Sequence, residues 1–166
     1  MDLIDLIKQF EGFKPKPYLD SASIPTIGIG TIRYPNGVRV TMRDPEITLA
    51  KAEEYLMHDL DAFKKDVSWL TKDVNLNINQ YNALVSFAYN VGSDIDIDTT
   101  PEGLGDSTLL KKVLINPNDP SIAEEFKKWN KAGGKVVKGL TIRRQKEAEL
   151  YFTAPQKDQL LYTSIQ

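Results

Sequence analysis

Apolar residues recur at helical spacing along most of the chain, but one segment near the N-terminus breaks this pattern. The first stretch predicts an amphipathic helix over residues 2–11 that stops at Gly12, with an apolar face made of Leu3, Leu6, Ile7 and Phe10. Residues 17–42 instead combine glycine, proline and β-branched residues, and Asn36-Gly37 is typical of a hairpin turn. The pattern therefore predicts a helix followed by a small antiparallel sheet.

A long apolar stripe follows this segment and predicts a helix that ends near residue 70. Asp44-Pro45 or Thr48 can begin it, and its stripe consists of Leu49, Ala52, Leu56, Leu60, Phe63, Val67 and Leu70. Asn79 can cap the next helix and Gly92 can end it. The rest of the pattern predicts helices at about 80–91, 107–115, 121–130 and 140–152, and we expect the patternless tail from Ala154 to fray.

Length and composition describe an ordinary soluble protein with one domain, or one domain divided into two lobes. The chain has 166 residues, of which 41% are hydrophobic and 27% charged. No apolar run approaches the roughly 20 residues that span a bilayer. Charged residues interrupt the apolar residues at the N-terminus, so we expect no signal peptide. If this start is native, we expect the protein to accumulate in the cytoplasm and to pass the inner membrane only after something else opens it.

The scarcity of cysteine and histidine narrows the possible chemistry. The sequence has no cysteine, which excludes disulfides, thiolate metal sites and a cysteine nucleophile. Its single histidine, His58, lies off the apolar stripe, so we expect a solvated side chain. Zinc amidases need several histidine or cysteine ligands, and a Ser-His-Asp triad needs a well-placed imidazole. Carboxylates are left for acid–base catalysis, and we expect neither a cofactor nor a metal.

The charge is distributed unevenly although the net charge is only −2. Residues 1–110 contain ten Lys and Arg against 17 Asp and Glu, a net charge of −7. Residues 111–146 contain ten Lys and Arg against three acids, a net charge of +7. Two interpretations remain open: a surface that attracts an anionic polymer such as a cell wall, or an ordinary solvated helix face.

Two carboxyls and a hydroxyl lie within a short span between residues 11 and 30. Glu11 ends the first helix, Asp20 follows a Pro-x-Pro-Tyr turn, and Thr26 opens a β-like stretch. Cleavage of a glycosidic bond needs one carboxyl to protonate the departing sugar oxygen and another to handle the water or the developing positive charge. Hydroxyls of Ser21 and Ser23 and nearby turn amides can keep Asp20 ionised.

The spacing of these three residues resembles the Glu, Asp/Cys and Thr triad of phage-type lysozymes, the endolysins that cut bacterial peptidoglycan. Further segments resemble that family in the same order, through about residue 152: Thr26–Gly30, Tyr34–Gly37, Gln80–Gly92, Ser107–Leu110, Ala132–Lys135 and Gly139–Arg144, followed by Glu147 and Leu150. The resemblance implies a mainly α, α+β fold with two lobes. It implies a catalytic domain over residues 1–153, with a sheet lobe at about 13–47, a connecting helix at about 48–70 and a helical lobe at about 77–153 that includes the N-terminal helix, then a tail at 154–166.

The resemblance also implies a function, hydrolysis of the β-1,4 bond between N-acetylmuramic acid and N-acetylglucosamine for host cell lysis. Glu11 is then the general acid, whose proton partial burial would retain near neutral pH. Asp20 serves as base or as electrostatic support for the transition state, and Thr26 holds the water. The family implies inversion at the anomeric carbon, for which the two carboxyls stand roughly 6.5–9.5 Å apart.

Substrate contacts are expected from Gly30, Asn90 and Lys135 by the same analogy, although a helix C-cap explains Asn90 nearly as well. We expect peptidoglycan as the partner, no nucleic acid, no integral membrane segment and a monomer. Three features depart from the family: Ser23 stands where many relatives have Gly, Thr31 where they have His, and the loop 94–106 is unusually acidic. The loss of that His concerns local stability more than catalysis.

Other interpretations remain for the site and for the acidic loop. A lytic transglycosylase needs no second carboxylate, so Asp20 and Thr26 argue against it; a noncatalytic wall-binding protein of the same fold is another alternative. The acids at 94, 96 and 98 lack the glycine and glutamate of an EF-hand, where Thr99 and Gly105 stand. A solvated loop is favoured over a loose cation site.

Overall fold

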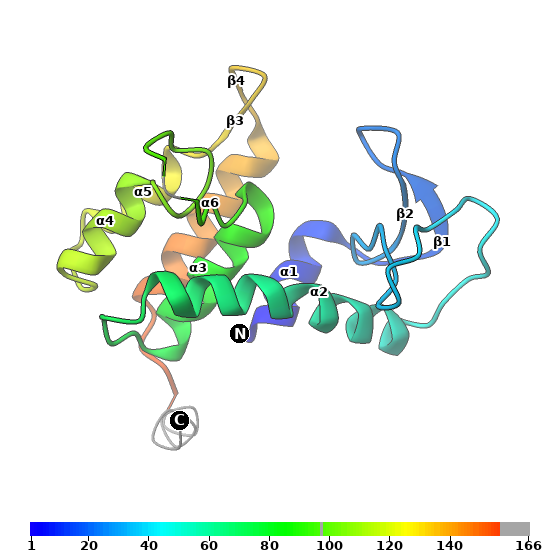
Figure 1. Ribbon diagram of the computed structural model, residues 1–166, viewed down its shortest axis with the longest axis horizontal. Helices are drawn as coiled ribbons and strands as arrows, with labels where there is room; N and C mark the ends of the chain where they lie inside the picture. The colour runs from blue at the N-terminus through cyan, green and yellow to red at the C-terminus, as the bar shows by residue number, and fades with distance from the viewer. Residues whose placement is uncertain (97, 157–166) are drawn as a thin grey trace. The chain divides into compact units, whose positions relative to one another are not determined.

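The chain folds into two compact units in the computed structural model, which describes residues 1–96 and 98–156. The contacts between Cα atoms divide the chain into residues 1–62 and 63–166 (Figure 1). By this division the N-terminal helix belongs to the first unit. Its place with the helical lobe, which the family resemblance implies, stays a prediction. Most of the expected C-terminal tail, residues 157–166, lies outside the described residues.

The first unit begins with α1 (Leu3–Glu11), as its apolar spacing predicts. The Asp2 side chain caps the helix by accepting a hydrogen bond of 2.8 Å from the Asp5 amide. Gly12 ends it with a φ of 70°, and its N–H donates to the Lys8 carbonyl. The helix buries three apolar residues, Leu3, Leu6 and Ile7. The predicted start and end of this helix are thus confirmed to within one residue.

An antiparallel pair of strands follows, β1 (Lys14–Leu19) and β2 (Pro25–Gly28), with Tyr18 opposite Thr26. The prediction of a turn at the Pro-x-Pro-Tyr segment is therefore wrong. The segment lies within β1, where the register is irregular between Lys14 and Tyr18. The predicted turn at Asn36-Gly37 is present, since the Gly37 amide donates to the Tyr34 carbonyl at 2.8 Å. It is flanked by an isolated bridge between Arg33 and Arg39 rather than by strands.

Gly28 lets β2 lie directly on α2 (Leu49–Leu70). Its φ is +68°, and a Cβ atom added there would lie 2.9 Å from the Cβ of Ala52. The helix begins after Thr48, whose Oγ1 accepts a hydrogen bond of 3.2 Å from the Lys51 amide. Its stripe is buried at Ala52, Leu56, Leu60 and Val67, as expected, but Leu49 is exposed. The first turn of α2 therefore contributes less to the core than its sequence predicts.

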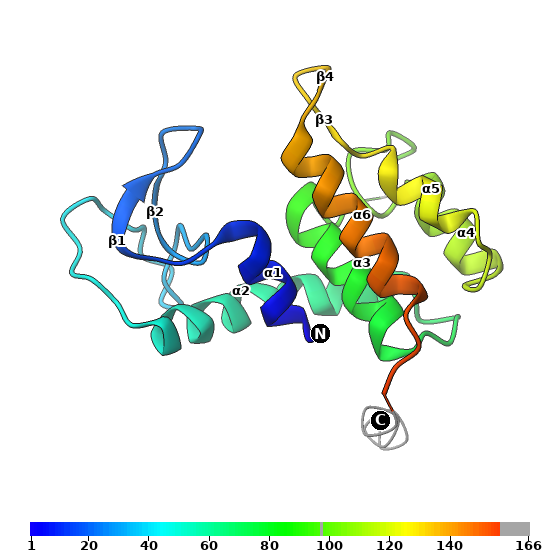
Figure 2. The same ribbon diagram turned by 180° about the vertical axis from the view of Figure 1, so that it is seen from behind.

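The described part of the second unit contains four further helices: α3 (Ile78–Val91), α4 (Thr108–Ile115), α5 (Ile122–Lys127) and α6 (Lys138–Phe152). In both views of the ribbon, α3 and α6 pack along each other, and α6 also contacts α5 (Figures 1 and 2). Asn77, not the predicted Asn79, caps α3 through a capping box with Gln80. Asn79 instead donates a hydrogen bond of 2.9 Å to the carbonyl of Thr153.

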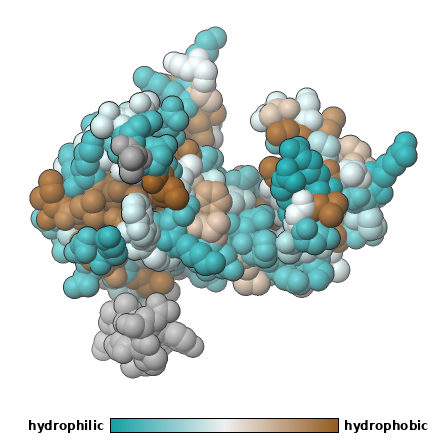
Figure 3. Space-filling view, viewed as in Figure 1, coloured by the Kyte–Doolittle hydropathy of each residue, from teal (hydrophilic) through white to brown (hydrophobic). Residues whose placement is uncertain are grey.

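The core of the second unit is built around aromatic rings in edge-to-face contact. The ring of Phe87 has its centroid 5.6 Å from that of Phe126 and 5.5 Å from that of Trp129. By contrast, the end of α4 leaves Leu114 and Ile115 exposed, and hydrophobic surface covers this helix in Figure 3. Of the helices in residues 1–96 and 98–156, none combines the length and apolar character that a membrane span requires.

A short hairpin between α5 and α6 was not predicted. It pairs β3 (Lys131–Ala132) with β4 (Lys135–Val136). Gly133 and Gly134 form its two-residue turn with φ values of 56° and 75°, and the two-residue hairpin turn with positive φ at both positions favours glycine. Lys135, a candidate substrate contact, therefore lies on the second strand of a tight hairpin.

Candidate active site

Glu11, Asp20 and Thr26 all belong to the first unit, and separate elements position them. Glu11 is the last residue of α1 and is partly exposed. Asp20 directly follows β1, and Thr26 lies in β2, where it is only 2% exposed. A helix end, a loop and a strand thus supply the three polar groups.

The loop between β1 and β2 fixes the Asp20 carboxylate. Its Oδ1 accepts two backbone hydrogen bonds, of 2.8 Å from the Ala22 amide and 2.9 Å from the Ile24 amide. These turn amides, rather than the hydroxyls of Ser21 and Ser23, therefore donate to the carboxylate. Its Oδ2 has no hydrogen-bond partner among the described residues, so this oxygen is available to a water molecule.

The Thr26 hydroxyl is oriented by a backbone carbonyl. Thr26 Oγ1 donates a hydrogen bond of 2.9 Å to the oxygen of Ile24. Because a hydroxyl has one proton and two lone pairs, this bond leaves Thr26 Oγ1 as an acceptor. A water beside it would donate one proton to Thr26 and direct its own lone pair elsewhere.

The Tyr18 hydroxyl is close enough to both Glu11 and Asp20 to feel their charges. The sequence pattern did not single out this residue. Burial raises the pKa of Tyr18, and the negative charges of Glu11 and Asp20 both raise it further. The Lys14 ammonium lies 4.0 Å from the centroid of the Tyr18 ring. Both candidate catalytic carboxyls therefore act on one phenol, on the strand that pairs with Thr26.

Ser23 occupies a position in this loop that favours glycine. Its φ is 61°, in the left-handed region, and it is the last residue of a turn closed by the hydrogen bond from its own amide to the Asp20 carbonyl. Three-residue hairpin loops commonly end on such a residue. A left-handed conformation costs an ordinary L-residue roughly 1–2 kcal/mol. The departure from the family at Ser23 therefore coincides with backbone strain beside Asp20.

We expect Ser23→Gly to raise the free energy of unfolding by up to about 1 kcal/mol, since relief of the strain exceeds glycine's added unfolded-state entropy. Ser21→Gly is the matched control in the same loop, and it should lower stability because Ser21 is not among the residues with positive φ. Urea titration of both variants measures the difference. A loss of stability in Ser23→Gly equal to that in Ser21→Gly would show that no strain is stored there.

Gly30 and Thr31 follow β2 in a tight turn of the first unit. Gly30 has a φ of 76° and lies within the isolated bridge between Ile27 and Thr31. Thr31 is fully buried, and its Oγ1 has no hydrogen-bond partner among the described residues. A buried hydroxyl of this kind reduces stability. The expected effect of the Thr31 departure on local stability stays a prediction.

A pocket of about 480 Å³ in the first unit contains none of the three candidate catalytic residues. It is lined by Tyr34, Pro35, Asn36, Asp44, Pro45, Ile47 and Tyr55. The Tyr34 hydroxyl donates a hydrogen bond of 2.7 Å to Asp44. Burial, and after it this hydrogen bond, raises the pKa of Tyr34. Hydrogen bonds, first from Thr41 and then from Tyr34, lower the pKa of Asp44. These groups satisfy one another and brace the segment before α2.

The second unit holds the other two candidate substrate residues, and the structure treats them differently. Asn90 is exposed near the end of α3 and lines a pocket of about 400 Å³ with Val91, Lys128, Trp129, Lys131 and Leu140. Lys135 is exposed on β4 and is not among the residues that line this pocket. Lys128, Trp129 and Lys131 were missed in the sequence, although a tryptophan between lysines in an acid-free stretch was a visible signal.

A buried charged cluster lies between α3 and α6. Glu147 is fully buried, and it accepts hydrogen bonds of 2.7 Å from Ser86 Oγ and 3.2 Å from Arg143 Nε. Its other oxygen lies 2.9 Å from Nη1 of Arg144, which is also fully buried. Burial raises the pKa of Glu147, while both guanidiniums act in the opposite direction. One carboxylate thus serves two buried cations.

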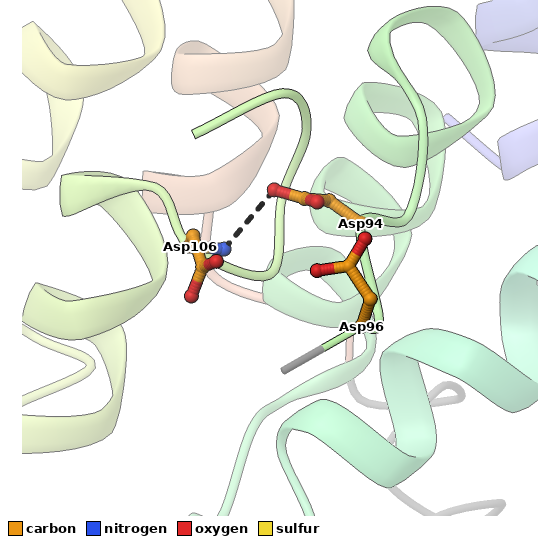
Figure 4. A group of neighbouring side chains, drawn as sticks. All are labelled: Asp94, Asp96 and Asp106. Carbon is orange, nitrogen blue, oxygen red and sulfur yellow. Dashed lines mark hydrogen bonds between the residues drawn. The ribbon is translucent and has the colours of Figure 1, made fainter. Parts of the chain in front are cut away.

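The acidic loop is organised by one of its own carboxylates. Asp94 has a φ of 52°, and its Oδ2 accepts hydrogen bonds from the amides of Glu102, Gly103 and Asp106. Figure 4 shows Asp94, Asp96 and Asp106 side by side, with one carboxylate oxygen of each within 4.8 Å of the others. The hydrogen bonds to Asp94 account for the fold of the loop.

The predicted solvated position of His58 is confirmed, since its side chain is 55% exposed.

Comparison with known proteins identifies the family. The sequence profile described as phage lysozyme matches residues 8–147. The endolysin of Bacillus phage B103 is 40% identical over 155 residues, which cover 93% of this chain and 54% of that protein. The endolysin of Salmonella phage P22 is 35% identical and covers 90% of this chain and 94% of that protein. The chain spans about half the length of the first of these curated relatives and nearly all of the second.

Solved structures agree with this assignment. An endolysin from the Escherichia coli O157:H7 phage FAHEc1 superposes with a TM-score of 0.78 at 38% identity, over 93% of this chain and 94% of that one. The chain therefore belongs to the phage lysozyme family, and it has that family's mainly α, α+β fold. The resemblance seen in the sequence motifs is confirmed.

Proposed function

We propose that this protein is an endolysin that acts as a muramidase. It hydrolyses the β-1,4 bond between N-acetylmuramic acid and N-acetylglucosamine in bacterial peptidoglycan and so lyses the host cell. The observation that supports this most is the environment of Asp20: one carboxylate oxygen is held by two amides and the other is free for water. Membership of the phage lysozyme family supports the same reaction.

The proposed mechanism uses three groups of the first unit. Glu11 donates its proton to the glycosidic oxygen as the bond to the anomeric carbon breaks. Asp20 Oδ2 takes a proton from the attacking water, whose oxygen forms the new bond to the anomeric carbon. Thr26 Oγ1 accepts the other hydrogen of that water, because its own proton is donated to the Ile24 carbonyl. One water is consumed, and the proton that Glu11 loses is balanced by the one that Asp20 gains.

This arrangement predicts inversion at the anomeric carbon, because the water attacks the face opposite to the departing sugar. Proton NMR of the first products released from soluble peptidoglycan chains measures the outcome, and we expect the α-anomer of the new reducing end. Initial release of the β-anomer would contradict this, and would make Asp20 the nucleophile of a covalent intermediate. Anhydro-sugar ends in the mass spectrum would indicate a transglycosylase instead.

The basic C-terminal part supports an electrostatic role in wall binding, but with fewer charges than the sequence suggests. Arg143 and Arg144 are buried, and three lysines are paired with Glu124 or Glu125. Three exposed lysines remain near the hairpin: Lys131, Lys135 and Lys138. We propose that these lysines attract the anionic wall polymer.

Binding to peptidoglycan should therefore weaken as salt is added, because a Debye length of about 8 Å at physiological ionic strength screens exposed charges. Pull-down on purified walls across a salt series measures this, and Lys131→Gln/Lys135→Gln/Lys138→Gln should flatten the dependence. Lys51→Gln/Lys65→Gln/Lys72→Gln, at three exposed lysines outside the basic part, is the matched control. Equal retention of the unmodified protein at low and high salt would restore the solvated-face interpretation.

We further propose that residues 1–153 act as one catalytic domain and that the protein works as a monomer. Light scattering coupled to size exclusion measures the mass, and 18.7 kDa is expected. A mass twice as large would contradict the monomer. Gly30, Asn90 and Lys135 remain proposed substrate contacts.

A further inference from the structure

Arg144 is a buried cation that reaches an exposed polar residue on another helix. It lies on α6 with no exposed surface, and its guanidinium carbon lies 4.9 Å from the centroid of the Phe87 ring. Its Nη1 faces Glu147, and its Nη2 donates to Oδ1 of Asn90 near the end of α3. The buried guanidinium is therefore hydrogen-bonded to a side chain that lines the pocket of about 400 Å³ in the second unit.

The chemistry of the guanidinium determines which way the Asn90 amide faces. Arginine has donors and no acceptor, so the atom of Asn90 that meets it is the carbonyl oxygen. The amide NH₂ group then points away from Arg144. Asn90 is exposed, and Nδ2 has no acceptor among the described residues. The amide is thus left as a donor at the surface of the pocket.

The guanidinium itself is held in place. Burial lowers the pKa of Arg144 to about 10, so it remains a cation near neutral pH. Glu147 neutralises it and is in turn held by Ser86 on α3 and Arg143 on α6. Because these groups are buried, the position of the Asn90 oxygen is set by the packing of two helices rather than by solvent.

The polar groups that line the pocket are donors. They are the amide of Asn90 and the ammonium groups of Lys128 and Lys131, beside the rings and methyl groups of Trp129, Leu140 and Val91. Lys128 shares its charge with Glu125 at 2.9 Å, whereas Lys131 has no ion-pair partner among the described residues. Such a pocket suits a hydrogen-bond acceptor attached to an apolar group.

We propose that Arg144 is a positioning residue for substrate binding. It fixes the Asn90 amide so that Nδ2 donates to an oxygen acceptor of the wall polymer, which the pocket beside Trp129 receives. The acceptor is an amide carbonyl or a carboxylate, and peptidoglycan carries such oxygens on both its acetylated sugars and its peptide stems. The proposal rests on the proposed function, because it assumes that Asn90 contacts peptidoglycan.

The first test replaces the donor and leaves the contact with Arg144. Asn90→Asp has the same shape and presents an oxygen to Arg144, but its second oxygen cannot donate. We expect KM for soluble peptidoglycan to rise about tenfold, the equivalent of one hydrogen bond, with kcat changed less than twofold and stability unchanged or higher. An unchanged KM in the folded variant would overturn the proposal.

The second test separates positioning from a purely structural role of Arg144. In a double-mutant cycle of Asn90→Ala and Arg144→Lys, we expect each single change to raise KM and the second to add little once the first is present. If the increase in KM of the double variant instead equals the product of the two single increases, Arg144 acts independently of Asn90. If thermal unfolding shows that Arg144→Lys is not folded, the Asn90→Asp measurement decides alone.

Two substrates distinguish the sources of the acceptor, and an inactive variant separates the two hypotheses. If the oxygen belongs to the stem peptide, Asn90→Asp raises KM on intact peptidoglycan but not on glycan chains stripped of peptides. If it belongs to the sugar, KM rises on both. If the unmodified protein is active and Glu11→Gln is not, the proposed function stands. In that case a normal KM in Asn90→Asp contradicts only the proposed role of Arg144 and Asn90. An inactive unmodified protein removes both.

Discussion

Replacing Glu11 with glutamine is expected to abolish wall lysis while leaving the fold intact. The amide matches the carboxyl in shape but cannot deliver a proton to the leaving oxygen, and general acid catalysis contributes on the order of 10²-fold or more. Glu11 ends α1, where Gly12 sets the helix terminus through its own backbone, so we expect the substitution to leave the end of α1 unchanged. The rate of fragment release from purified peptidoglycan, followed by mass spectrometry, measures the loss.

A matched variant separates catalysis from the loss of a negative charge. Glu46→Gln removes an exposed carboxylate from the same unit and should lyse walls at the normal rate. Glu11→Gln should unfold at a temperature close to that of the unmodified protein and still sediment with peptidoglycan. Near-normal lysis by folded Glu11→Gln protein would refute the assignment, and the catalytic site would have to be sought among other residues.

Replacing Glu147 with glutamine should cause a large loss of stability. The carboxylate is fully buried, and it is the carboxylate that faces Arg144. Its removal leaves a buried guanidinium without a counter-charge, and breaking a buried ion pair in this way costs about 3–5 kcal/mol. Urea or thermal unfolding measures the difference.

Glu149→Gln on the same helix is the control for this experiment. Glu149 is exposed, and among the described residues its carboxylate accepts a hydrogen bond from Gln145 alone, so we expect a change within about 0.5 kcal/mol. If Glu147→Gln is no less stable than Glu149→Gln, the cluster of buried charges does not hold α3 and α6 together. The same result would weaken the argument that Arg144 is fixed in place.

Local sequence was sufficient where a structural element depends on neighbouring residues. The apolar spacing of α1 and the glycine after it predict both its buried face and its end. The same holds for the end of α3 at Gly92. The motif around Glu11, Asp20 and Thr26 likewise indicated the family through residue type and spacing alone. These features are encoded within a few residues, so periodicity, capping chemistry and spacing are enough to find them.

Local sequence was insufficient where a competing partner comes from elsewhere in the chain. Asn77 and Asn79 are equally good caps, and the choice of Asn77 leaves Asn79 to meet the Thr153 carbonyl. The β3–β4 hairpin has only two residues in each strand, too few for a period to emerge. The Pro-x-Pro-Tyr segment was misassigned because pairing with β2 outweighs its turn propensity.

The sequence by itself therefore determined the helices with strong periodicity, the family and the three residues proposed for catalysis. The tertiary structure alone decided the direction of their polar groups: the free oxygen of Asp20, the acceptor lone pair of Thr26 and the outward amide of Asn90. It also decided that Arg143, Arg144 and Glu147, which look like a solvated helix face, are buried. The physical reason is that hydrogen-bond direction and burial depend on which distant groups pack against a side chain, and residue spacing along one helix does not contain that information.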